Sequence, residues 1–185
     1  MKSFAKILLL ISTAEVIASN LFPLYATYVQ HIGGNLFDVG STLALQSIVV
    51  GVGSILSSRI ATKYKTEKLH LVLGYLISAF VFLAYPHITN PQQFYITQFV
   101  DGIGLSLVIP AFSGLYSSIQ EAGQHTKGWG NYFGSANIAA GIALLASGSI
   151  AQHFGYNTLF YAVAAFEFLT VIMALCLFRL NLEQN

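Results

Sequence analysis

Long apolar runs separated by short polar stretches dominate the pattern of residues along this chain. Each run is close to the length of about 20 residues that an α-helix needs to cross the hydrocarbon core of a bilayer. Gly, Asn and Pro residues, which favour turns, fall between the runs. We therefore predict six membrane-spanning helices. They cover about residues 7–29, 39–60, 69–88, 94–118, 129–152 and 157–178.

The composition supports this prediction. Of the 185 residues, 55% are apolar and 8% are charged, and the mean hydropathy is +0.67. These values are typical of a membrane protein rather than a soluble domain. The expected fold class is an all-α membrane protein with a single six-helix domain over residues 1–185. The net charge of +1 argues against a nucleic-acid partner, because phosphate binding requires a clustered basic surface.

The lysines and arginines indicate how the chain is oriented. They fall at the termini or in alternate connections, and the connections around 31–38, 86–93 and 152–157 hold none. By the positive-inside rule, we expect both termini to be cytoplasmic. The expected location is the cell (inner) membrane. An even number of spans also puts both termini on one side. The first basic connection holds Arg59, Lys63, Lys65 and Lys68. We expect these four residues to set the orientation and to contact lipid headgroups.

Three acidic residues interrupt the apolar runs, namely Glu15, Asp101 and Glu167. An ionised side chain at mid-membrane costs about 2.5–3.5 kcal/mol on insertion scales, so such residues usually have a function. We expect Glu15 and Asp101 to bind protons or to neutralise a cationic substrate. The alternative is that each is a protonated acid bonded to a neighbouring helix. The same choice applies to Glu167.

Four amide side chains also lie within the apolar runs. Such groups either orient a substrate by hydrogen bonds or bond to a neighbouring backbone. These residues are Asn20, Gln46, Gln98 and Asn137. A further polar residue, Asp38, precedes the second run, where it is expected to cap the helix.

Motifs of enzymes are absent from the sequence. It holds no phosphate loop, no paired-cysteine metal site and no Gly-x-Ser-x-Gly nucleophile turn. We therefore expect that the protein is not an enzyme and that it needs no cofactor and no metal.

The two halves of the chain resemble each other weakly. A shift of 87 residues lays Pro23 on Pro110. We therefore expect two three-helix repeats, over about 5–88 and 92–180. Because an odd number of spans reverses the orientation, the second repeat is inverted relative to the first. Inverted repeats are common in secondary transporters.

Glycine-containing motifs carry a resemblance to a known family. The fourth run reads Gln98-Phe-Val-Asp-Gly-Ile-Gly104 and continues to Pro110-Ala111. This segment resembles the fourth-helix motif of the major facilitator superfamily, Arg-x-x-x-Gly-x-Gly followed by Pro-Ala, with Gln98 at the position of the arginine. Lys127-Gly128 and the glycines after it resemble the fifth-helix motif. The similarity covers nearly the whole chain and implies one six-helix half of that fold.

The resemblance implies a secondary transporter that works by alternating access, with helices one and four lining its cavity. One half leaves this cavity uncovered, so we expect a parallel homodimer or assembly with a second half-transporter. Small residues in the second and fifth runs would let two subunits approach closely, or would pack within one chain. These are Gly40, Ser47, Gly51, Ser54, Gly134, Gly141 and Gly148.

The expected activity is proton-coupled movement of a small cationic or lipophilic solute. The acids would attract cations, and no basic residue lies within the core of any apolar run. The expected partners are membrane lipid, the solute and protons. An alternative function is that of a non-transporting membrane module that assembles with or regulates a partner membrane protein.

Overall fold

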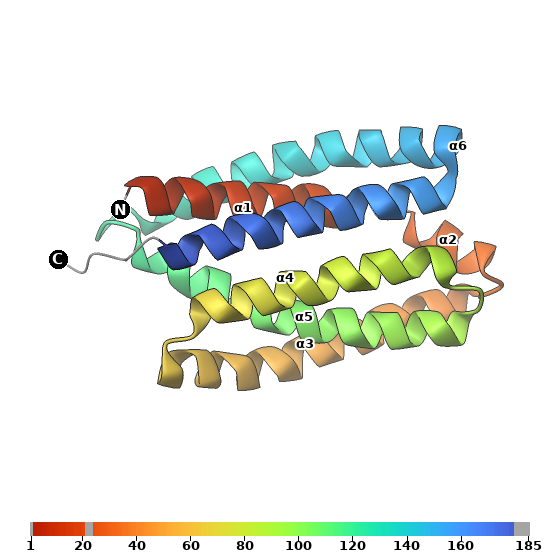
Figure 1. The fold of residues 1–185 in the computed structure, drawn as a ribbon, viewed down its shortest axis with the longest axis horizontal. Coiled ribbons are helices and arrows are strands. Elements are labelled where there is room, and N and C mark those ends of the chain that lie inside the picture. The colour runs from red at the N-terminus through yellow and green to blue at the C-terminus, as the bar shows by residue number, and fades with distance from the viewer. Residues whose placement is uncertain (1, 21–23, 180–185) are drawn as a thin grey trace.

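The structure is a computed structural model that describes residues 2–20 and 24–179, and only the backbone of residues 2, 3, 20 and 179. Within those residues the chain is helical and has no strand. The long helices run side by side as a bundle (Figure 1). The helices are α1 (Lys2–Asn20), α2 (Tyr25–His31), α3 (Leu36–Tyr64), α4 (Glu67–Ala84), the short 3-10 helix η1 (Tyr85–His87), α5 (Pro91–Ser118) and α6 (His125–Arg179).

Helix α6 folds back on itself at one residue. Gly155 has φ 80° and ψ 170°, a conformation that is open almost only to glycine. Figure 1 shows the two parts of α6 running in opposite directions from this bend. We call residues 125–154 the first leg and residues 156–179 the second leg. The predicted turn near residue 155 is therefore a single-residue reversal rather than a loop.

Four helices in the described part of the chain are long and apolar enough to cross a membrane. The predicted spans 39–60, 69–88 and 94–118 each correspond to one of these helices, while the last two predicted spans both lie in α6. The first predicted span corresponds to α1 and α2, on either side of residues outside the description. The number of six crossings therefore stays a prediction.

The start of α3 is fixed by a capping box. The side chain of Asn35 accepts hydrogen bonds from the backbone N–H of Phe37 at 2.7 Å and of Asp38 at 3.2 Å. In return, Asp38 Oδ2 accepts a hydrogen bond from the Asn35 N–H at 2.8 Å. These bonds satisfy N–H groups that have no partner within the helix. Asp38 therefore takes part in capping α3, as predicted, but from the third position of the helix, and Asn35 is the N-cap residue.

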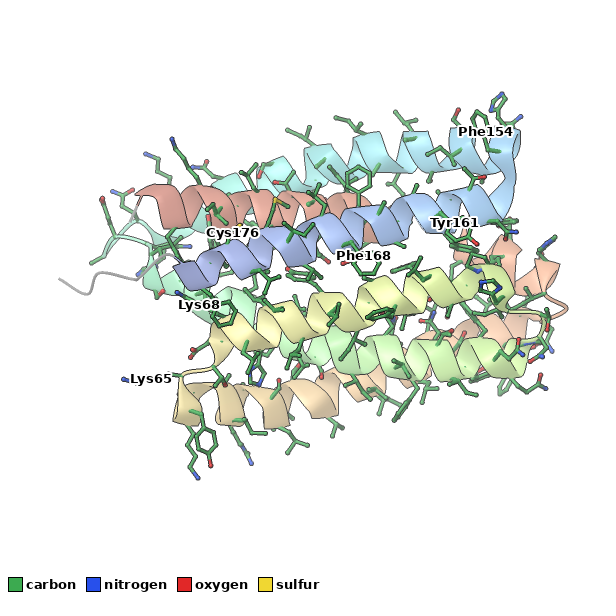
Figure 2. The ribbon with its side chains drawn as sticks, viewed as in Figure 1. Lys65, Lys68, Phe154, Tyr161, Phe168 and Cys176 are labelled. Atoms are coloured by element: carbon green, nitrogen blue, oxygen red, sulfur yellow. The ribbon has the colours of Figure 1, made fainter. Side chains whose placement is uncertain are left out.

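The basic connection lies at the end of the bundle where α1 begins (Figure 2). Arg59, Lys63 and Lys65 are exposed there. Lys68 differs, because its Nζ donates a hydrogen bond to the carbonyl oxygen of Leu177 at 2.8 Å. Lys68 thus ties the start of α4 to the last turn of α6, where a positive charge is favourable.

Two apolar clusters fill the bundle, one toward each end. One contains Tyr85, Phe94 and Phe160. The other contains Leu8 and Leu71. Four helices, α1, α4, α5 and the second leg of α6, contribute buried residues to both clusters. On each of them, polar residues lie between the stretch that belongs to one cluster and the stretch that belongs to the other. A belt of polar side chains therefore crosses the middle of the bundle.

Helix α3 is the least covered of the long helices. Only 6% of its most apolar window is buried within the chain, against 56% for α4 and 50% for α5. Most of its surface is therefore left to lipid or to another protein.

Candidate functional site

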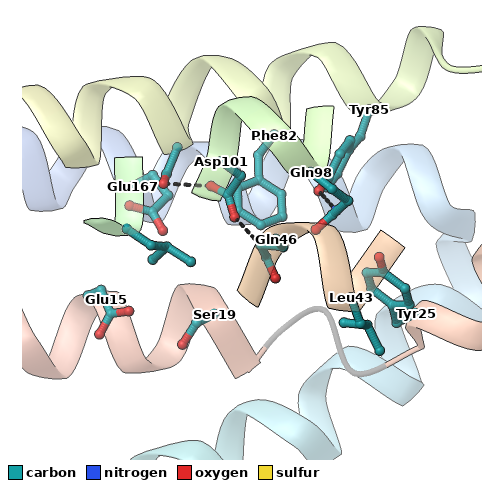
Figure 3. Close-up of a pocket in the computed structure, with 12 residues that line it drawn as sticks. Glu15, Ser19, Tyr25, Leu43, Gln46, Phe82, Tyr85, Gln98, Asp101 and Glu167 are labelled. Atoms are coloured by element: carbon teal, nitrogen blue, oxygen red, sulfur yellow. Dashed lines mark hydrogen bonds between the residues drawn. The ribbon is translucent and has the colours of Figure 1, made fainter. Parts of the chain in front are cut away.

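A cavity of about 230 Å³ lies within the polar belt (Figure 3). Side chains from α1, α2, α3, α4, η1, α5 and the second leg of α6 contribute to its walls. The polar members of the lining are Glu15, Ser19, Tyr25, Gln46, Ser78, Tyr85, Gln98, Asp101 and Glu167. All three acids predicted from the sequence therefore meet at one cavity, and two of the four predicted amides join them.

Asp101 is the centre of the hydrogen bonding in this cavity. Its side chain is buried, with 6% exposed. Oδ2 accepts a hydrogen bond from Gln46 Nε2 of α3 at 2.8 Å, and Oδ1 accepts one from Ser78 Oγ of α4 at 2.7 Å. Each carboxyl oxygen thus has a donor, as a buried acid requires. Asp101 joins three helices at the middle of the bundle.

Glycines next to Asp101 let the three helices approach closely enough for these bonds. A Cβ atom on Gly102 would stand 3.1 Å from the carbonyl oxygen of Gln46 in α3. A Cβ atom on Gly104 would stand 3.0 Å from the carbonyl oxygen of Gly74 in α4. The two glycines of the predicted motif therefore face different neighbours. They give α5 close contact with α3 on one side and with α4 on the other.

Gln98 lies one helical turn before Asp101 and is almost fully buried, with 1% exposed. Its Nε2 donates a hydrogen bond to the hydroxyl oxygen of Tyr85 at 2.6 Å. Its Oε1 is buried and has no hydrogen-bond partner among the described residues. Tyr85 is held in turn by Tyr28, whose hydroxyl donates to the Tyr85 carbonyl oxygen at 2.9 Å. The amide is therefore fixed on one side and unsatisfied on the other.

Glu167 reaches the same cavity from the second leg of α6. Its side chain is 3% exposed. Its Oε2 is buried and finds no hydrogen-bond partner within the described part of the chain. A buried acceptor without a donor costs the desolvation of that atom. Glu167 is thus a stronger site candidate than its position in the last predicted span had indicated.

Glu15 stands between two cavities. It is half-buried and lines both the central cavity and a second cavity of about 260 Å³. Tyr75, Trp129 and Tyr132 contribute aromatic walls to the second cavity, and Leu105 is shared with the first. Of the three acids, Glu15 is therefore the one that borders both cavities, whereas Asp101 and Glu167 line only the central one.

Two predicted amides are not placed in the site. Asn137 is exposed on the first leg of α6, and its Nδ2 donates to the carbonyl oxygen of Phe133 at 2.8 Å. It satisfies its own helix, because an amide four residues along can reach the backbone. The side chain of Asn20 lies outside the described residues.

The predicted small residues lie mostly on the outside of the chain. A Cβ atom added to Gly40, Gly51, Gly134, Gly141 or Gly148 would meet nothing within 4 Å. Ser47 is exposed as well, and Ser54 is half-buried with its Oγ unpartnered among the described residues. The five glycines therefore have no side chain or backbone packed directly over them within the described part of the chain, and the packing role of the stripes stays a prediction.

The sequence did not single out Ser78 and Tyr85. Both residues bond to predicted site residues, Ser78 to Asp101 and Tyr85 to Gln98. The available signal for Ser78 was a hydroxyl four residues after Gly74, in the middle of an apolar run. Tyr85 gave no signal, because tyrosine is abundant near the ends of such runs.

Comparison with known proteins gives two matches. Residues 7–185 match the family model described as Major Facilitator Superfamily. The chain is also 25% identical over 156 residues to a Bacillus subtilis (strain 168) protein named "Uncharacterized MFS-type transporter YitZ". That alignment covers 84% of this chain and 94% of the relative, so the two proteins are similar in length.

Proposed function

Because the chain belongs to the major facilitator superfamily, we propose that it is a half-size secondary transporter that moves a small cationic or lipophilic solute by alternating access. The observation that carries this proposal is the central cavity, at which Glu15, Asp101 and Glu167 meet. Carboxyl groups inside a membrane bundle that face a cavity are typical of substrate and proton pathways.

In this proposal, the chain crosses the membrane six times as two inverted repeats. The contacts between helices support this arrangement. Helix α3 of the first proposed repeat packs along α5 of the second, and α1 packs along α6. Helix pairs that cross between repeats are expected when two inverted units interlock. The basic connection at one end of the bundle favours that end as cytoplasmic.

A homodimer would complete the path. The central cavity, at about 230 Å³, is smaller than the roughly 300 Å³ at which ligand pockets usually begin. The outward small residues of α3 and of the first leg of α6, such as Gly51 and Gly141, have open space above them. We propose that the α3 stripe of one copy meets the α6 stripe of a second copy, with the two-fold axis along the membrane normal.

The acids divide the proposed work. Asp101 already accepts hydrogen bonds from two helices, so it organises the site. Glu15 is half-buried and faces two cavities, which suits a group that exchanges a proton with water. A proton on Glu15 and a cation near it would compete, because only the ionised form attracts the cation. This competition couples solute movement to protons.

Flux measurements in liposomes test the transport proposal. The purified protein is reconstituted with a pH-sensitive dye inside, and a panel of organic cations is added outside. We expect solute-dependent proton movement that Glu15→Gln and Asp101→Asn each reduce about 10-fold or more. Glu121→Gln, a matched change at an exposed residue between α5 and α6, leaves the flux unchanged. Unchanged proton-dependent flux in the two acid variants would refute the coupling. No flux with any solute would favour the non-transporting module.

Disulfide crosslinking tests the dimer. Ser47→Cys and Gly141→Cys are made in a Cys176→Ser background and co-expressed in membranes. We expect a mixed disulfide between the two chains. The unmodified protein is the control, because its single cysteine, Cys176, is exposed on the second leg of α6 and belongs to neither stripe. Crosslinks at Cys176 but not at the stripes would contradict the proposed interface, and crosslinks only to another protein would indicate a different second half.

A further inference from the structure

Two residues that line the central cavity carry buried acceptors that lack donors. They are Glu167 Oε2 and Gln98 Oε1, and neither atom has a hydrogen-bond partner among the described residues. Both side chains are at least nine-tenths buried, at 3% and 1% exposed, and both line this cavity. In Figure 3 they lie on two sides of Asp101 and contribute from different helices. Buried polar atoms are normally bonded, so two unsatisfied acceptors at one cavity indicate a missing donor.

Most of the side-chain donors that line the cavity are directed to other protein atoms. Gln46 Nε2 and Ser78 Oγ donate to Asp101. Ser19 Oγ donates to the carbonyl oxygen of Val16 at 3.2 Å, and Tyr25 OH donates to Thr42 Oγ1 at 2.8 Å.

The amide of Gln98 is committed in the same way. Its Nε2 donates to Tyr85. None of the described lining residues is a lysine or an arginine. The lining of the cavity therefore holds two buried acceptors without donors and three carboxyl groups.

From these contacts we infer that the solute carries a protonated primary or secondary amine, whose N–H groups donate to Glu167 and which offers a further donor to Gln98. This inference rests on the proposed transport function and names the solute class of the same site. The rings of Tyr25, Phe82 and Tyr85 also line the cavity and suit the apolar part of such a cation. A quaternary ammonium ion has the same charge but no N–H, so it leaves both acceptors unsatisfied.

A matched pair of ligands separates these two kinds of cation. Phenethylamine and its N,N,N-trimethyl analogue are each titrated into the full-length protein in nanodiscs, and the heat of binding is measured. We expect the amine to bind ~10-fold or more tightly than the trimethyl analogue, because a site built for donors rejects a ligand that lacks them. Equal affinities, or tighter binding of the trimethyl analogue, would overturn the inference.

Substitutions assign the preference to the amide. Gln98→Leu should lower the affinity for phenethylamine ~10-fold and leave the trimethyl analogue unchanged, since only the amine uses the acceptor. Gln98→Glu, which keeps an acceptor at this position, should restore the preference for the amine. Asn137→Leu is the matched control, because that amide is exposed and bonds to its own helix, and it should change neither affinity.

Other results would contradict the assignment. Equal loss of both ligands in Gln98→Leu would show that the amide acts on the shape of the site through Tyr85. Flux of other solutes in liposomes without binding of either probe would refute this inference alone. Absence of flux for every solute would also refute the transport proposal on which it rests.

Discussion

Gly74 offers a direct test of how the site is assembled. A Cβ atom at this position in α4 would stand 2.6 Å from the carbonyl oxygen of Gly104 and 3.3 Å from the backbone nitrogen of Val108, and it would also run into the Val108 side chain. Backbone atoms cannot rotate away as a flexible side chain can. Gly74→Ala must therefore push α4 away from α5.

The expected change can be worked out from two opposing contributions. Inserting a methyl group into a packed interior costs about 1–3 kcal/mol. Replacing glycine by alanine within a helix returns up to about 1 kcal/mol. Because the clash is with backbone atoms, the cost lies in the upper part of that range, about 2–3 kcal/mol. The net destabilisation of Gly74→Ala is therefore roughly 1–2 kcal/mol, which for a chain of this length lowers Tm by about 2–8 °C. The separation also lengthens the hydrogen bond from Ser78 to Asp101, so binding to the central cavity weakens as well.

Thermal unfolding of the purified protein in detergent measures this change. Gly114→Ala is the matched control, because Gly114 lies within α5 and a Cβ atom there meets nothing within 4 Å. The control should keep the Tm or raise it slightly, since only the helix propensity changes. The same Tm for Gly74→Ala and Gly114→Ala would refute the close crossing of α4 and α5 on which the geometry around Asp101 depends.

Two further predictions concern the bend in α6 and the start of α3. Gly155→Ala should cost about 1–3 kcal/mol, because only glycine is readily accommodated at φ 80° and ψ 170°, whereas Gly130→Ala, with open space around it, should cost nothing in the same unfolding assay. If the two variants unfold alike, the bend in α6 does not depend on glycine. Asn35→Ala should cost about 0.5–2 kcal/mol and speed hydrogen exchange in the first turn of α3, because two N–H groups lose their acceptor. Unchanged exchange there would show that water replaces the cap.

The apolar runs predicted where the helices lie but not where they end. The second run was expected over 39–60, whereas α3 covers Leu36–Tyr64. The added segments, residues 36–38 and 61–64, contain both apolar and polar residues. They are helical because Asn35 caps the start of α3 and Lys65, at φ 54°, ends the helix in the left-handed region. Windows of hydropathy detect the part of a helix that suits lipid, and caps extend it into the interface.

Polarity within apolar runs located much of the site. Asp101, Gln46 and Gln98 were predicted because a polar group at that depth needs a partner or a function, and all three line the central cavity. Polarity alone does not give the face of the helix. Asn137 has the same chemistry but is exposed, does not line the cavity and bonds to its own backbone.

The bonds of the site depend on how the helices are aligned with one another. Ser78 meets Asp101 because Gly104 and Gly74 set the distance and register between α5 and α4. No periodicity within a single helix carries this information. Glu167 illustrates the same limit, because its burial follows from the return of the second leg of α6 toward α4 after the bend.

The scant coverage of α3 within the chain has a consequence for how substitutions should be distributed in this protein. A scan of every α3 position for the stability of the isolated chain would find most of the outward surface tolerant, since little there is packed. A scan of the same positions for cell growth that requires the protein would also detect substitutions that disturb contacts with whatever packs against this surface in the membrane. The positions at which the two scans disagree would trace the outline of the neighbour.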